Sequence, residues 1–172
     1  MCISCGCDLP PRPRREIRPL DSQKLRPDEA VLIATEDALS RAESWLGWSG
    51  NAVLGLGSVW TPHKAMRRMA DHLIDHLTQI ECLANGEATV PDRWLGRAVT
   101  LDSDWAHFTE HDLDEATARL RRLAQILALR LRALEAIWDR PAPESWTIRA
   151  IAEHVVEATG QYAARVPAAA VR

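Results

Sequence analysis

Apolar residues recur at intervals of three or four positions in four stretches of the chain, and this spacing predicts four helices. The clearest stretch begins at Thr61, which can cap a helix, and Pro62, which suits the first helical turn. It ends near Asn85 and Gly86. Its apolar stripe consists of Met66, Met69, Leu73, Leu77 and Ile80.

Three further stretches show the same periodicity, from about Asp28 to Trp45, from about Asp112 to Trp138, and from the potential cap Thr147 to about Val166. No segment alternates convincingly between apolar and polar residues with a period of two. The sequence therefore predicts an all-α fold, a four-helix bundle that spans residues 28–166.

The segments between the predicted helices differ in length and composition. Residues 47–59 are rich in glycine but lack the Gly-Lys-Ser/Thr sequence of a phosphate-binding loop, so we interpret them as a helix connection. Residues 87–109 form a longer connection, and such connections are often functional or partly helical. At its end His107 and His111 form an HxxxH pattern among acidic residues, which favours an exposed helix start over a ligand role.

Both ends of the chain are predicted to lie outside the bundle. Residues 1–27 are rich in cysteine, proline and arginine and are expected to form a flexible tail, and residues 167–172 a short C-terminal tail. Cys2, Cys5 and Cys7 supply three of the four ligands that structural zinc prefers, and Asp8 or a cysteine of a second chain could supply the fourth. Two interpretations stay open, reactive thiols in a flexible tail and a metal site.

Composition narrows the class of protein. The chain has 172 residues, is 47% hydrophobic and carries a formal net charge of −3, which suits one domain with a core and argues against a dedicated nucleic-acid binder. No apolar run approaches the roughly 18 residues that span a membrane, so no membrane partner is expected. The N-terminus lacks the apolar core of a signal peptide, and a cytoplasmic location is therefore expected.

Three histidines are candidate metal ligands. His72 and His76 stand four residues apart, so both rings project from one side of the same helix, on the shoulder of its apolar stripe. His154 lies on the shoulder of the stripe of the last helix. Helical bundles build metal sites from side chains on facing helices, and three imidazoles leave a coordination position open for water or substrate. Residue type alone suits zinc, nickel, iron or copper.

The sequences around these histidines resemble the two signature helices of the DinB/YfiT-like family of helical bundles. WTPHKAMRRMADHLIDHLTQI matches the family's helix with an HxxxH pattern at His72 and His76, followed by Gln79 and Ile80. PESWTIRAIAEHVVEATGQYAARV matches its helix that opens with Trp-Ser/Thr and carries a single histidine, here His154. In the family the single-histidine helix usually comes first, and a circular permutation would account for the reversed order here.

The resemblance implies a four-helix bundle, frequently a homodimer, with a three-histidine site for a divalent metal, zinc or nickel above all. It also implies a thiol-dependent S-transferase or isomerase that acts on a small electrophile with mycothiol, bacillithiol or glutathione. Asp75 and Tyr162 are candidates for supporting catalytic roles, because Asp75 adjoins the histidine pair and Tyr162 lies two turns beyond His154. The alternative is a non-catalytic interaction or scaffold domain with a cysteine-rich tail.

Overall fold

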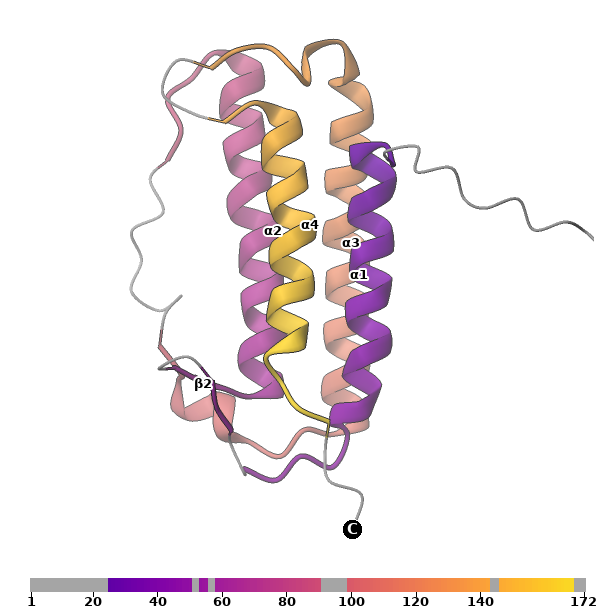
Figure 1. Cartoon of the computed structure of the whole chain (residues 1–172), viewed down its shortest axis with the longest axis vertical. Helices are drawn as coiled ribbons and strands as arrows, with labels where there is room; N and C mark the ends of the chain where they lie inside the picture. The colour runs from indigo at the N-terminus through magenta and orange to yellow at the C-terminus, as the bar shows by residue number, and fades with distance from the viewer. Residues whose placement is uncertain (1–24, 51–52, 56–57, 91–98, 143–145, 169–172) are drawn as a thin grey trace, which may run out of the picture.

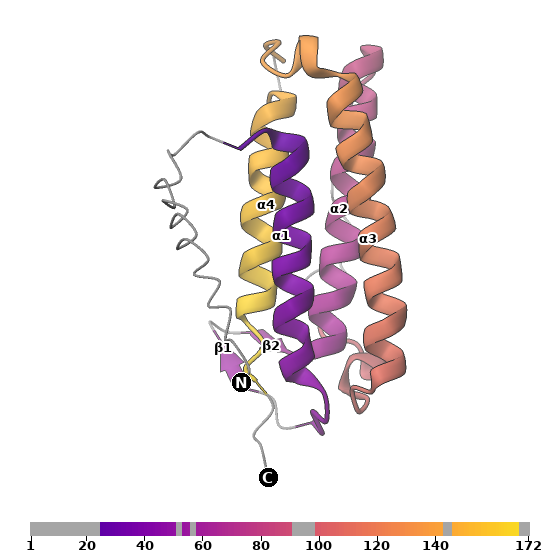
Figure 2. The same ribbon diagram turned by 90° about the vertical axis from the view of Figure 1, so that its right-hand side faces the viewer.

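The computed structural model describes residues 25–50, 53–55, 58–90, 99–142 and 146–168. Within them the fold is all-α, as predicted, and its four α-helices are α1 (Pro27–Ala42), α2 (Pro62–Asn85), α3 (Glu110–Ala133) and α4 (Ile148–Ala164). Figures 1 and 2 show the four helices side by side along one long axis. The predicted flexible tail, with Cys2, Cys5 and Cys7, lies almost entirely outside the described residues.

Each helix packs against two others in a square arrangement. The pairs in contact are α1 with α3, α1 with α4, α2 with α3, and α2 with α4. In Figure 1, α1 and α4 run from the top of the bundle to the bottom, whereas α2 and α3 run from the bottom to the top. The pair that carries the candidate histidines, α2 and α4, is therefore antiparallel and in direct contact.

Short elements occupy the connections. Among the described residues the 3₁₀-helices are η1 (Glu43–Trp45), η3 (Asp102–Trp105) and η4 (Glu135–Ile137). The glycine-rich connection contains two antiparallel strands, β1 (Val53–Gly55) and β2 (Ser58–Trp60), in which Val53 pairs with Trp60. We did not predict this pair from the sequence, because strands of three residues are too short to show a period-two pattern.

Side-chain caps begin three of the four helices. Thr61 accepts a hydrogen bond from the backbone N–H of Lys64, and Thr147 from that of Ala150, so both predicted caps are confirmed. Thr109 and Asp112 form a reciprocal capping box, which starts α3 slightly before its predicted first residue.

The end of α3 differs from the sequence prediction. The α-helix ends at Ala133 instead of near Trp138, and the chain continues as η4. The indole Nε1–H of Trp138 donates to the backbone oxygen of Leu131 at 2.7 Å. This bond satisfies one carbonyl of the last turn and folds Trp138 back into the core, where Leu120, Leu127 and Leu131 of α3 are also buried.

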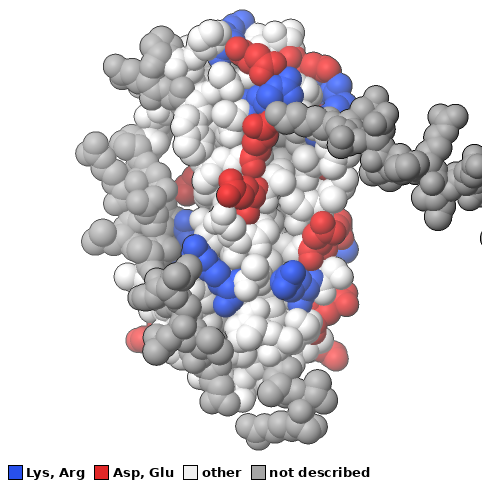
Figure 3. Space-filling view, in the orientation of Figure 1, with Lys and Arg blue, Asp and Glu red and all other residues white. Residues whose placement is uncertain are grey.

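The core is built from the predicted apolar stripes and from indole rings. Of the stripe on α2, Leu77 is partly buried and the others are buried, namely Met66, Met69, Leu73 and Ile80. Trp45, Trp48, Trp60 and Trp138 are also buried, so the indole-rich composition serves packing. The face in Figure 3 carries acidic and basic side chains interspersed. No helix of the described segments combines the length and the hydropathy needed to cross a bilayer.

Replacing Asp28 by asparagine is expected to lower the free energy of unfolding by about 1–2 kcal/mol, a moderate value because the two partners are partly exposed. The Asp28 side chain is buried and binds Arg132 at 3.0 Å and Arg26 at 3.1 Å, which ties the start of α1 to the end of α3. Burial raises the pKa of Asp28, but the bond from Arg132 and the charge of Arg26 outweigh it, and the pKa ends below its usual value. Urea unfolding measures the loss, with the exposed Asp37→Asn on the same helix as the control. Equal stability of the two variants would contradict this role.

Candidate metal centre

The antiparallel contact of α2 and α4 brings the three candidate histidines together. The buried stripe of α2 faces the bundle, and the four-residue spacing puts His72 and His76 at the edge of that stripe beside α4. The cap at Thr147 starts α4, and His154 follows about two turns later, level with the pair. The imidazoles approach one another from two helices that are far apart in the sequence.

The ring contacts describe a compact cluster. The ring centroids of His72 and His76 lie 4.3 Å apart, those of His72 and His154 4.9 Å, and those of His76 and His154 5.1 Å. One ring nitrogen from each residue lies within 4.8 Å of the other two. The predicted convergence of these side chains is thus confirmed, while metal binding stays a prediction.

The donor set and its dimensions fit a divalent ion. Around a tetrahedral zinc with Zn–N distances of about 2.05 Å, ligand nitrogens lie about 3.3 Å apart. Ring rotations that draw these nitrogens together by at most about 1.5 Å would therefore form one face of such a site. Three imidazoles also leave a fourth position for a ligand from solution.

The environment of His72 favours the neutral form that a metal ligand needs. His72 is 8% exposed. Its Nε2 atom is buried and makes no hydrogen bond within the described part of the chain. Burial above all, and then the nearby His76, His154 and Arg68, lowers the pKa of His72 from 6.5 to about 3. A buried neutral imidazole that lies against two other imidazoles and keeps one nitrogen unsatisfied is the observation that best fits a metal site.

Gln79 orients the second histidine. The Nδ1 atom of His76 lies 2.8 Å from the side-chain oxygen Oε1 of Gln79, one turn further along α2. Since an amide oxygen only accepts, Nδ1–H is the donor, which places the lone pair of the ring on Nε2. Metal-ligating histidines usually donate their other N–H in this way. The i, i+3 spacing of His76 and Gln79 is the sequence signal for this contact.

Two aromatic side chains border the cluster, one on α4 and one directly before its N-cap Thr147. Tyr162 lies edge-on to His72, with a centroid separation of 5.5 Å, and Trp146 lies edge-on to His154 at 4.9 Å. Trp146 is half exposed and also lines a cavity of about 280 Å³ together with Leu83, Ile137 and Pro141. An aromatic ring therefore lies against His72 and another against His154, and the mostly apolar cavity beside Trp146 also includes Glu87 and Arg140 in its lining.

The other candidates of the sequence analysis differ in their burial and surroundings. Asp75 is partly buried on α2, and its charge raises the pKa of the neighbouring Asp71, after the larger effect of burial. His107 and His111 are exposed near the start of α3, as expected. In the described ranges, the triad is the one group of at least three His, Cys, Asp or Glu side chains spaced to hold a metal ion. The sequence analysis gave no role to Trp146, although it precedes the Thr147 cap directly.

The fold and the site together describe an all-α four-helix bundle with a three-histidine cluster between two antiparallel helices. Comparison with models of protein families, with curated proteins and with solved structures finds no match to this chain.

Proposed function

We propose that this chain is a metal-dependent enzyme of the DinB/YfiT-like type, in circularly permuted helix order, that uses a low-molecular-weight thiol to transform a small electrophile. His72, His76 and His154 hold a divalent ion, zinc or nickel. The observation that carries the proposal is the convergence of three imidazole nitrogens within 4.8 Å, with His72 buried and neutral. Such an ion supplies Lewis acidity, which lowers the pKa of a thiol or a water molecule.

The residues of the chain have separate roles in this proposal. The three histidines bind the ion from one side, and the hydrogen bond to Gln79 keeps His76 in one tautomer and orientation. Trp146 and the cavity behind it give the apolar part of an electrophile a surface that excludes water. Of the two candidate catalytic side chains, Tyr162 lies edge-on to His72, and Asp75 directly precedes His76 on α2.

A turnover assay tests the catalytic step. The protein is loaded with zinc or nickel and screened with glutathione, mycothiol and bacillithiol against small electrophiles. We expect thiol consumption above the uncatalysed rate with at least one pair, and its loss in the metal-free protein and in His154→Ala. His107→Ala serves as the matched control, because it removes an exposed imidazole far from the triad in the sequence. If the fully loaded protein turns over no pair, the bundle is better interpreted as a non-catalytic interaction domain.

A further inference from the structure

A group of aromatic and basic side chains lies beside the histidine cluster, toward the start of α2 and the end of α4. We call Trp60, Tyr162, Arg68 and Arg165 the basic aromatic shelf. The rings of Trp60 and Tyr162 stack with their centroids 5.3 Å apart. The Arg165 guanidinium carbon lies 4.7 Å from the centroid of Trp60, and that of Arg68 lies 5.7 Å from the centroid of Tyr162. One guanidinium group thus lies against each ring of the stacked pair.

The shelf is continuous with the candidate metal centre. Tyr162 belongs to both, because its ring also lies edge-on to His72. Arg68 precedes His72 by four residues, so the two side chains leave α2 on the same side, about 5–6 Å apart at their Cβ atoms. Arg68 is 5% exposed, whereas Arg165 is exposed at the end of α4, so the shelf leads from solvent to the buried histidine.

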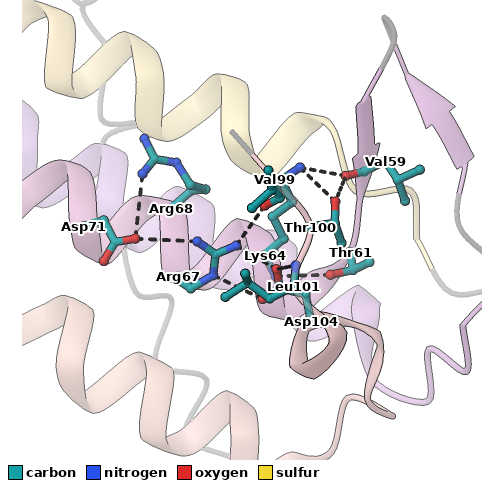
Figure 4. Close-up of polar contacts among 10 residues, drawn as sticks. All are labelled: Val59, Thr61, Lys64, Arg67, Arg68, Asp71, Val99, Thr100, Leu101 and Asp104. Atoms are coloured by element: carbon teal, nitrogen blue, oxygen red, sulfur yellow. Dashed lines mark hydrogen bonds and ion pairs between the residues drawn. The ribbon is translucent and has the colours of Figure 1, made fainter. Parts of the chain in front are cut away.

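Arg68 lies farther from the carboxylate of Asp71 than its neighbour Arg67 lies from the carboxylate of Asp104. Arg67 contacts both carboxylate oxygens of Asp104, at 3.2 and 2.6 Å, and donates to the backbone oxygen of Val99. Figure 4 shows Arg67 directed to the connection that contains Val99 and Asp104, and Arg68 directed to α4. The distance from Arg68 Nη1 to Asp71 Oδ2 is 3.7 Å, too long for a hydrogen bond, and Arg67 shares the same oxygen at 3.9 Å. Asp71 is therefore a charged neighbour of Arg68 at longer range than Asp104 is of Arg67.

A third cation strengthens the positive potential at the shelf. Lys64 is buried, and its Nζ lies 5.0 Å from the ring centroid of Trp60. Nζ donates to two neutral oxygens, the backbone oxygen of Val59 at 3.0 Å and the hydroxyl of Thr100 at 2.9 Å. Figure 4 shows the hydrogen bonds of Lys64 to Val59 and Thr100 at the start of α2. Burial lowers the pKa of Lys64 although the nearby Asp104 opposes this effect, and an anion at the shelf would favour the charged form of Lys64.

We propose that the basic aromatic shelf binds an oxyanion group, carboxylate or phosphate, of the small molecule that acts at His72, His76 and His154. This inference rests on the proposed metal-dependent function. It names the substrate class as small molecules in which an oxyanion and the group that reaches the metal are separated by about the length of one helical turn. Arg68 and Arg165 donate hydrogen bonds to the oxyanion, and Tyr162 packs against the carbon atoms between the two groups.

Spectroscopic titration of the cobalt-loaded protein tests the inference without turnover. Cobalt(II) replaces zinc, and its visible spectrum reports both metal binding and a ligand that enters beside the metal. Succinate, inorganic phosphate and neutral succinamide are titrated at constant ionic strength. We expect succinate or phosphate, whichever oxyanion is the true ligand, to perturb the spectrum with saturation, and succinamide to have no effect.

The variants separate the shelf from the metal. Arg165→Gln and Arg68→Gln should each weaken anion binding roughly tenfold, and Arg68→Lys should weaken it less. Arg149→Gln, at the opposite end of α4 and paired with Asp139, should bind as the wild type does. Because Arg68 is buried and Arg165 is exposed, Arg165→Gln remains informative even if Arg68→Gln does not fold.

Three results would overturn the inference. A cobalt spectrum that does not respond to either anion would do so, as would anion affinities of Arg165→Gln within twofold of the wild type. In both cases the cobalt spectrum still shows the metal bound, so the proposed metal site survives. Absence of cobalt binding itself would remove the proposed function and the shelf's role together.

Discussion

The wild-type protein is expected to bind a single equivalent of zinc, and His76→Ala is expected to lose it. The rings of His76, His72 and His154 contribute one nitrogen each, so a single deletion leaves two ligands and opens half of a tetrahedral shell. We expect a loss of affinity of more than about a hundredfold, since changes in the outer shell of a site already cost about 10–100-fold. The loss of affinity in Gln79→Ala should fall within that smaller range, because this variant removes the hydrogen bond to His76 Nδ1 and keeps all three imidazoles. Calorimetric titration and metal analysis of the dialysed protein measure both effects.

A matched control separates this site from ordinary surface histidines. His111→Ala removes an exposed imidazole at the start of α3 and should bind zinc as the wild type does. The thermal unfolding temperature should rise with zinc in the wild type and in His111→Ala, because a ligand at about 100 times its Kd adds about 2.7 kcal/mol of stability. If His76→Ala still retains one equivalent of zinc after dialysis, the triad is not the metal site.

Lowering the pH from 7 to 5 is expected to cost the metal-free protein about 2 kcal/mol of unfolding free energy through His72. Burial and the neighbouring charges lower the pKa of His72 to about 3 in the folded protein. Between that value and the ordinary pKa of about 6.5, the unfolded chain binds a proton that the folded chain does not. Stability is therefore full above about pH 6.5 and declines as the pH falls, by about 1.4 kcal/mol per unit.

Urea unfolding at both pH values, with a chelator present, measures this dependence. His72→Gln should remove about 2 kcal/mol of the difference between pH 7 and pH 5, because glutamine does not titrate. His111→Gln should keep the wild-type difference. An equal loss of stability in His72→Gln and the wild type would show that the folded protein accommodates a protonated His72 without cost.

The helices could be predicted closely because their causes are local. The caps Thr61 and Thr147 and the apolar spacing from Met66 to Ile80 act within one turn of the chain, and these predictions are confirmed. The end of α3 could not be predicted, because it depends on a bond from the Trp138 side chain to Leu131 that forms when the helix stops early. The strands β1 and β2 were missed because their pairing extends over only three residues in each strand.

The histidine pair on α2 follows from sequence, since a spacing of four residues on a helix puts two rings on one side. That His154 completes the group depended on the packing of α2 against α4, which run in opposite directions and bring positions about eighty residues apart to one level. The same packing placed Tyr162 between His72 and the basic aromatic shelf. Local spacing sets which side of a helix a residue occupies, but the long-range contacts of the bundle core set which helix that side meets.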